Sequence, residues 1–219
     1  MKRFIALLII GVFAALPLQA EEFSEGVHYA RLMVPVETQD SSKVEVVEIF
    51  SYACIHCRNF DPWIERWRES LAGDVLFRRV PAVFNKTWEV FARAFFTAQV
   101  LEVSAAIHTP IFEAIHGEGV DLRDPAVLAA FFELHAGVAP EQFEGVFNSM
   151  ALTSRVSNAN ALGRAYGITG VPTMIVDGQY RVDGKMAGSN SRMLEVVDHL
   201  IAQIRSAKGL EAVSSGGGQ

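Results

Sequence analysis

VEVVEIFSYACIHC, residues 44–57, is the stretch that decides the fold. β-branched and apolar residues dominate its first half, which is typical of a strand covered on both faces. Its second half brings Cys54 and Cys57, the two cysteines of the chain, to the predicted start of a helix. A strand that leads into a Cys-x-x-Cys unit in this way indicates thiol redox chemistry.

The residues after this stretch predict a βαβ unit. Apolar residues at spacings of three and four, from Phe60 to Leu71, predict a helix over residues 57–71. Pro62 should kink this helix without ending it, because the apolar stripe continues on both sides. A second apolar strand over residues 75–80 would then lie parallel to the first. The sequence therefore predicts an α/β fold.

Residues 86–151 differ in character, because they contain no convincing strand. We predict several short helices there, one capped by Thr109 with Pro110 in its first turn and another beginning at Asp124. The phenylalanines of this segment recur at helical spacing, so we interpret them as core and not as a ligand-binding box. The chain after it is predicted to form a helix, two strands joined by a hairpin turn, and a final helix, over residues 153–166, 173–176, 179–182 and 190–204.

The chain begins with a pattern typical of a secretory signal. Lys2 and Arg3 precede an apolar run, and the small residue Ala20 stands ahead of an acidic pair. We therefore expect residues 1–20 to be removed on export, by cleavage near Ala20. The apolar run is shorter than the about 20 residues of a transmembrane helix. An uncleaved membrane anchor is the alternative.

Composition narrows the choice of partners and of domain organisation. The chain has 19 lysines and arginines against 25 aspartates and glutamates, a formal net charge of −6. An acidic balance argues against nucleic acid as a partner. The residues beyond the expected signal suffice for one domain with an insertion, or for two small domains, with a sizeable core.

Cys54 and Cys57 are explained better by chemistry than by scaffolding. A disulfide between them would close so small a loop that its effect on stability would be slight. Disulfide exchange needs a thiolate that attacks and a second thiol that resolves the mixed disulfide. Cys54, at the helix N-terminus, is expected to have the lowered pKa of a nucleophile, and His56 adds a donor beside it. A structural disulfide and half of a zinc site are the alternatives, but the other histidines show no matching ligand spacing.

Two features outside the pair can serve the same chemistry. Glu48, six residues before Cys54, would lie beneath the helix start if its strand is central, where it can accept or relay the proton of Cys57. An exposed or ion-paired strand residue is the alternative. Pro172 belongs at the first position of a strand, and a cis bond from Val171 would leave the preceding backbone free to pair with a bound peptide. Spacing alone does not establish a cis bond.

The sequence FSYACIHC at residues 50–57, the preceding Glu48, the helical segment and GVPT at residues 170–173 together resemble the DsbA family of periplasmic thiol:disulfide oxidoreductases. The resemblance covers essentially the whole chain beyond the expected signal. It implies a thioredoxin-like fold with a central mixed β-sheet and an inserted all-helical domain. The thioredoxin-like domain would comprise residues 21–85 and 152–208, and the helical insertion residues 86–151. Residues 209–219 would form a flexible tail.

The resemblance also implies residue roles. Cys54 would be the nucleophile and Cys57 its partner. His56 would tune the thiolate, and Glu48 would be the buried acid. Val171 and Pro172 would form a cis-proline loop that faces the cysteines. Ile55 departs from the family, whose members usually have proline there. An isoleucine leaves the amides on the Cys57 side free to donate and alters the surface that partners meet.

The implied activity is that of a monomeric periplasmic dithiol oxidase. It would pass the Cys54–Cys57 disulfide to reduced, newly exported proteins through a mixed disulfide at Cys54. A DsbB-like membrane quinone reductase would reoxidise it, and no metal, cofactor or nucleic acid is expected. The alternatives are a disulfide isomerase or reductase, and a non-catalytic thioredoxin-like binding protein or chaperone.

Overall fold

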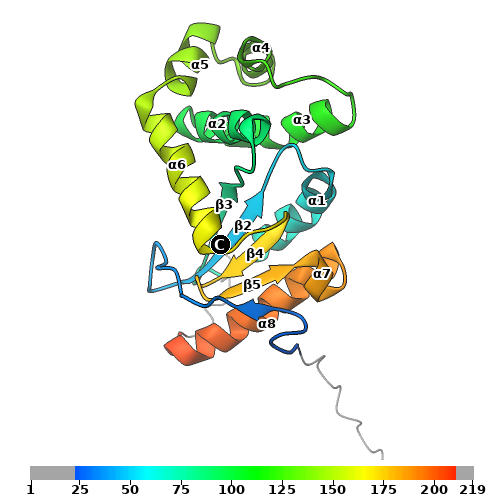
Figure 1. Cartoon of the computed structure of the whole chain (residues 1–219), viewed down its shortest axis with the longest axis vertical. Coiled ribbons are helices and arrows are strands. Elements are labelled where there is room, and N and C mark those ends of the chain that lie inside the picture. Colours follow the sequence, from blue (N-terminus) through cyan, green and yellow to red (C-terminus); the bar gives the residue numbers. More distant parts are fainter. Residues whose placement is uncertain (1–22, 211–219) are drawn as a thin grey trace, which may run out of the picture.

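A five-stranded mixed sheet forms the centre of the computed structural model, which describes residues 23–210 (Figure 1). The strand order is β1-β5-β4-β2-β3. β2 is parallel to β3, as the βαβ pattern predicts, and antiparallel to β4. The α/β fold with a mixed sheet is therefore confirmed. The strands are β1 Ala30–Arg31, β2 Val44–Phe50, β3 Val75–Pro81, β4 Thr173–Val176 and β5 Tyr180–Asp183. The helices are α1 Ile55–Glu69, α2 Lys86–Val100, α3 Ser104–His116, α4 Pro125–Ala136, α5 Pro140–Phe147, α6 Met150–Ala165, α7 Gly184–Ala187 and α8 Asn190–Lys208.

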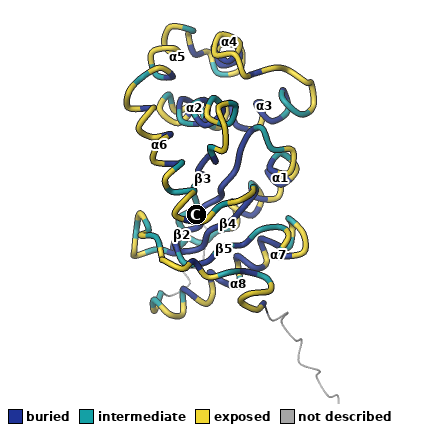
Figure 2. The backbone as a smooth tube through the Cα atoms, viewed as in Figure 1, coloured by how far each residue is buried: buried dark blue, intermediate teal, exposed yellow. Residues whose placement is uncertain are grey.

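Strand β2 is buried along its whole length, because helices cover both faces of the sheet (Figure 2). On one face Val46 packs in a core shared with α1 and α8. On the other face Val47 and Ile49 pack with Tyr166 and Ala159 at α6. Successive residues of a strand point to opposite faces, so a strand buried on both sides carries apolar residues at nearly every position.

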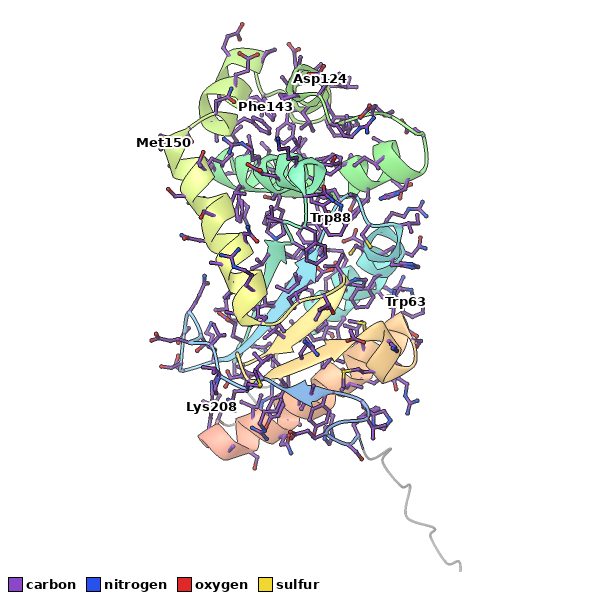
Figure 3. The ribbon with its side chains drawn as sticks, in the orientation of Figure 1. Trp63, Trp88, Asp124, Phe143, Met150 and Lys208 are labelled. Carbon is purple, nitrogen blue, oxygen red and sulfur yellow. The ribbon has the colours of Figure 1, made fainter. Side chains whose placement is uncertain are left out.

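The helices α2 to α5 and the start of α6 form the helical half of the molecule, which stands at one end of the sheet (Figure 1). Its core is aromatic, as the phenylalanine spacing predicts, and includes Phe91, Phe95, Phe112, Phe132, Phe143 and Phe147. The same cluster takes in Phe50, Tyr52 and Cys57. Trp88 lies where this half meets the sheet (Figure 3), packed on the core that contains Val80. The helical half therefore touches the end of β2 and the redox motif directly.

The predicted start of α3 is wrong. The helix begins at Ser104, and Thr109 and Pro110 lie inside it. Ile107 and Ile111 are fully buried on either side of the proline. Packing of an apolar face supplies most of the stability of a protein helix, so this burial outweighs the single hydrogen bond that a proline removes.

Other helix ends shift by a few residues. The helix predicted to begin at Asp124 is α4, and Asp124 caps it by accepting from the Ala126 N–H at 2.9 Å. Helix α6 begins at Met150 because the Ser149 hydroxyl caps it. It therefore runs across residue 151, where the helical insertion was predicted to end. We propose that the two domains meet along α6.

Two predictions lie outside the described residues, namely the signal over residues 1–20 and most of the tail over residues 209–219. Within the described part, α8 continues past its predicted end to Lys208, and Gly209 ends it with a left-handed φ of 63°. The Lys208 ammonium donates to Asp177 at 2.6 Å, which ties the end of α8 (Figure 3) to the β4–β5 turn. None of the helices in residues 23–210 combines the length and apolarity needed to cross a membrane.

Candidate active site

Cys54 and Cys57 lie at the start of α1, directly beyond the end of β2. Cys54 is the N-cap residue with extended backbone angles (φ −100°, ψ 113°), and Cys57 lies in the first turn. The Cys54 N–H donates to the Ser51 carbonyl at 3.0 Å, which closes the turn between strand and helix. Cys54 is partly exposed, whereas Cys57 is 1% exposed. Both are free thiols, so the structure shows the dithiol form.

The two thiols differ in acidity because their surroundings differ. A hydrogen bond from the Cys57 thiol lowers the pKa of Cys54 to about 6, and the backbone N–H groups of Cys57 and His56 add to the effect. Burial raises the pKa of Cys57 well above its ordinary value, and the negative charges of Cys54 and Glu48 act in the same direction. At neutral pH the pair therefore consists of one thiolate and one thiol.

Val171 and Pro172, in the loop directly before β4, lie against Cys54. The peptide bond between them is cis. The Val171 carbonyl oxygen lies 3.4 Å from the Cys54 sulfur, within reach of a thiol donor. Thr173, the first residue of β4, donates its hydroxyl to the Gly170 carbonyl at 2.8 Å, which holds the loop in shape. The structure thus brings together two motifs that are 117 residues apart in the chain.

Glu48 is a buried, ion-paired carboxylate, with 2% of its surface exposed. It accepts from Arg79 Nε at 2.7 Å, and Arg79 is its direct neighbour in the parallel register of β2 and β3. Burial raises the pKa of Glu48, and the Arg79 charge opposes this only in part. Glu48 acts in turn on Cys57, since its charge is one of the causes that raise the pKa of that thiol.

Arg79 links Glu48 to α1 and, through it, to the helical half. Its guanidinium also contacts Asp61 at 3.2 Å and Glu65 at 2.7 Å. Burial acts to raise the pKa of Asp61, but the hydrogen bond to His108 and the nearby positive charge bring that pKa below its usual range.

His108, from α3, completes this buried cluster. Its Nε2 lies 3.0 Å from Asp61 and its Nδ1 lies 2.9 Å from the Tyr52 hydroxyl. Tyr52 belongs to the turn that carries the cysteines, and burial raises the pKa of its hydroxyl. The charged cluster therefore runs from beneath the redox motif into the helical half.

Asp61, Glu65 and His108 place one potential metal-ligand atom each within 4.8 Å of one another. Arg79 already contacts both carboxylates. The Arg79 guanidinium thus occupies the position among the acids where a metal cation would have to bind.

The two residues between the cysteines face solvent. Ile55 is 43% exposed and His56 is also exposed. His56 contributes through its backbone N–H and its charge, both of which lower the pKa of Cys54. Ile55 leaves an apolar side chain on the surface beside Cys54.

Comparison with known proteins places this chain in a family. Residues 64–200 match the family described as DSBA-like thioredoxin domain. The chain belongs to the DsbA family. The thiol:disulfide interchange protein DsbA of Pseudomonas aeruginosa is 39% identical over 202 residues, which cover 92% of this chain and 95% of that protein. DsbA of Azotobacter vinelandii is 40% identical over 199 residues, which cover 89% and 92%.

Solved DsbA structures share the fold. The crystal structure of Pseudomonas aeruginosa DsbA is 40% identical and superimposes with a TM-score of 0.81, over 85% of this chain and 97% of that one. DsbA from Xylella fastidiosa gives a TM-score of 0.77 at 36% identity, over 82% and 96%. The expected thioredoxin-like DsbA fold is confirmed, and the chain is a thiol:disulfide oxidoreductase.

Some residues of the candidate site are absent from the sequence prediction. Arg79 could be identified only once the register of β2 against β3 was known, which sets it opposite Glu48. Asp61 gave a weak signal, as an acid beside the buried Phe60 stripe of α1. His108 gave none, since its place depends on how the helical half packs against α1.

Proposed function

We propose that this DsbA-family protein is a dithiol oxidase that donates the Cys54–Cys57 disulfide to reduced exported proteins. The difference in pKa between the two thiols is the observation that carries the proposal. A thiolate of low pKa leaves readily, and Cys54 has a pKa lowered to about 6. The reduced enzyme is thereby favoured over the mixed disulfide at Cys54. Resolution of the mixed disulfide therefore proceeds toward an oxidised substrate.

The exchange proceeds in two balanced steps. A substrate thiolate attacks the partly exposed Cys54 sulfur, the Cys54–Cys57 bond breaks, and Cys57 leaves and takes up a proton. A second substrate thiolate then attacks the substrate's own sulfur in the mixed disulfide and expels Cys54 as a thiolate. The substrate leaves with a new disulfide, and the enzyme carries the two electrons as its dithiol.

Glu48 serves as the proton acceptor and donor for Cys57 in this scheme. Burial raises the pKa of Glu48 above its ordinary value, which makes its carboxylate a better proton acceptor. Burial of Cys57 leaves little solvent to accept the proton directly. His56 stabilises the Cys54 thiolate, and the exposed Ile55 takes part in the surface that partners meet.

Val171 and Pro172 bind the backbone of the substrate around its cysteine. The support is that the Val171 carbonyl already faces the Cys54 sulfur at 3.4 Å. A segment that reacts with this sulfur must pass beside the loop.

The protein acts as a monomer in the periplasm after export, and its partners follow from the family. Reduced exported proteins are its substrates, and a DsbB-like membrane quinone reductase restores its disulfide. The signal pattern of residues 1–20 supports export.

Replacement of Cys54 by serine tests the mechanism. We expect Cys54→Ser to abolish oxidation of a reduced test protein, while Cys57→Ser traps mixed disulfides that are visible on non-reducing gels. Oxidation that persists in Cys54→Ser would show that the protein works without this nucleophile. Insulin reduction and recovery of scrambled ribonuclease, measured beside substrate oxidation, separate an oxidase from a reductase and an isomerase.

A further inference from the structure

A groove of about 410 Å³ lies beside the cis-proline loop. Its lining includes His56, Val171 and Pro172, and the charged residues Arg181, Asp183 and Lys185. Val171 also faces the Cys54 sulfur. A polypeptide whose cysteine reacts with Cys54 therefore has residues of its own beside this groove.

The charges of the groove are unequal. Asp183 is engaged as the cap of α7, accepting from the Met186 N–H at 2.9 Å. Lys185 is exposed, and within residues 23–210 it makes no ion pair. The groove lining thus has two positive side chains, Lys185 and Arg181, and one carboxylate, Asp183, which already accepts a hydrogen bond.

Arg181 adds a second positive charge to the groove. Its Nη1 donates to the Gly167 carbonyl at 2.7 Å, which fixes the guanidinium beyond the end of α6. Its Nε is buried and has no hydrogen-bond partner in the described part of the chain. Because the Nε is closed to solvent, Arg181 acts on the groove through the positive charge of its guanidinium.

The acidity of the whole chain does not cancel this local charge. The formal net charge is −6, but charges farther away than about 8 Å are largely screened at physiological ionic strength. A side chain inside the groove responds mainly to the groups that line it.

We propose that the groove selects substrate segments that carry an acidic residue close to the reacting cysteine. The carboxylate binds between Lys185 and Arg181 while the backbone passes Val171. This selectivity rests on the proposed oxidase function and adds a preference among its substrates.

Three dithiol peptides that differ only in one residue, two positions from the reacting cysteine, test the preference. The residue is Glu, Gln or Lys, and the oxidised protein is mixed with each peptide at low ionic strength and at 0.5 M salt. Neighbouring charge also changes the reactivity of a peptide thiol, so each rate is divided by the rate of the same peptide with oxidised glutathione. We expect a corrected Glu-to-Gln ratio of about three to five, as for a partly exposed ion pair, and a ratio near one in high salt.

Lys185→Glu is the informative variant, and Arg155→Glu is its matched control. Arg155 is exposed on α6 and lines a different cavity, so Arg155→Glu makes the same change in net charge away from the groove. We expect Lys185→Glu to bring the Glu-to-Gln ratio to one or below and to favour the Lys peptide. Arg155→Glu should keep the preference of the unaltered protein.

The outcomes separate the two proposals. Equal corrected rates for all three peptides, or a preference lost equally in both variants, would overturn the groove proposal and leave the oxidase function standing. Failure of the unaltered protein to oxidise any peptide would overturn the oxidase function itself.

Discussion

Strand β2 carries two buried glutamates, and comparison of their surroundings separates scaffold from active site. Glu45 is 0% exposed and accepts from Arg78 through both carboxylate oxygens, each at 3.1 Å. The backbone N–H of Gln39 adds a third hydrogen bond. Glu45 therefore has an arginine almost to itself, on the face of the sheet away from the cysteines.

Glu48, three residues on, points to the opposite face and must share its arginine. Arg79 divides its guanidinium among Glu48, Asp61 and Glu65. The pKa of Glu48 is raised by burial that the shared charge does not offset. The comparison teaches that burial in a strand does not mark a functional acid, whereas burial with incomplete neutralisation beside a reactive thiol does.

Replacing Arg78 and Arg79, one at a time, should give the largest difference in stability between the two glutamate–arginine pairs. We expect Arg79→Met to lower the free energy of unfolding by about 5 kcal/mol and Arg78→Met by about 3 kcal/mol, the two ends of the range for breaking a buried ion pair. The reason is that Arg79 serves three carboxylates and Arg78 one. Urea unfolding of the reduced proteins measures both values.

A second change checks the cause of that difference. Glu48→Gln added to Arg79→Met removes one uncompensated charge and should restore part of the lost stability. Equal losses for the two arginine variants, with no recovery on adding Glu48→Gln, would contradict the idea that Arg79 is shared.

The glutamates themselves should differ in the rate of redox turnover. We expect Glu48→Gln to slow oxidation of the reduced enzyme by glutathione disulfide by about 10- to 100-fold, because the buried Cys57 then lacks its proton acceptor. Glu45→Gln should leave that rate within about twofold, although it also removes a buried charge. Stopped-flow tryptophan fluorescence follows the reaction, and an equal slowing in both variants would assign Glu48 a structural role only.

This contrast also shows what the sequence can and cannot reveal. Cys54, Cys57 and Glu48 could be singled out because the motif and its strand are local in the chain. The fold class followed from the same local periodicities. Whether Glu48 was paired, and with what, required the register of β2 against β3.

The part that sequence could not supply depends on packing between distant segments. The cis bond before Pro172 has no signature in spacing. The bonds of His108 to Asp61 and Tyr52 depend on how α3 lies against α1. The predicted start of that helix at Thr109 was wrong for the same reason, since the burial of Ile107 extends it backward.

Cys57→Ala tests how far the thiol next to Glu48 controls the pKa of Cys54. The hydrogen bond from Cys57 is the largest cause that lowers the pKa of Cys54, so its loss should raise that pKa from about 6 by about one unit, the usual worth of a hydrogen bond to a charged group. Thiolate absorbance at 240 nm against pH measures the change. Glu45→Gln, on the other face of the strand, should leave the midpoint unmoved. An unmoved midpoint in Cys57→Ala would mean that backbone N–H groups alone hold the thiolate.

The smallest expected effect is on the pH dependence of stability, which should differ between the reduced and oxidised forms and should not depend on Glu45. The folded pKa of Cys54 is about 6, below the ordinary value of about 8.5. Its thiolate therefore stabilises the reduced fold fully above about pH 8.5, and this contribution is lost as the pH falls through about 6. At pH 7 the contribution is on the order of 1 kcal/mol, because Cys54 is partly exposed and the shift is only partly expressed there.

Cys57 contributes to the stability of the reduced form with the opposite dependence on pH. Its raised pKa keeps it a thiol in the folded protein while the unfolded chain ionises, so it lowers the stability of the reduced form above about pH 8.5. Thermal melts of both redox forms should show the reduced form more stable, by a margin that grows from pH 6 to about 8.5 and then shrinks. Glu45→Gln should move both melting curves together and leave the margin intact. An oxidised form that melts higher at pH 7 would exclude a strongly oxidising disulfide, whatever the state of Glu48.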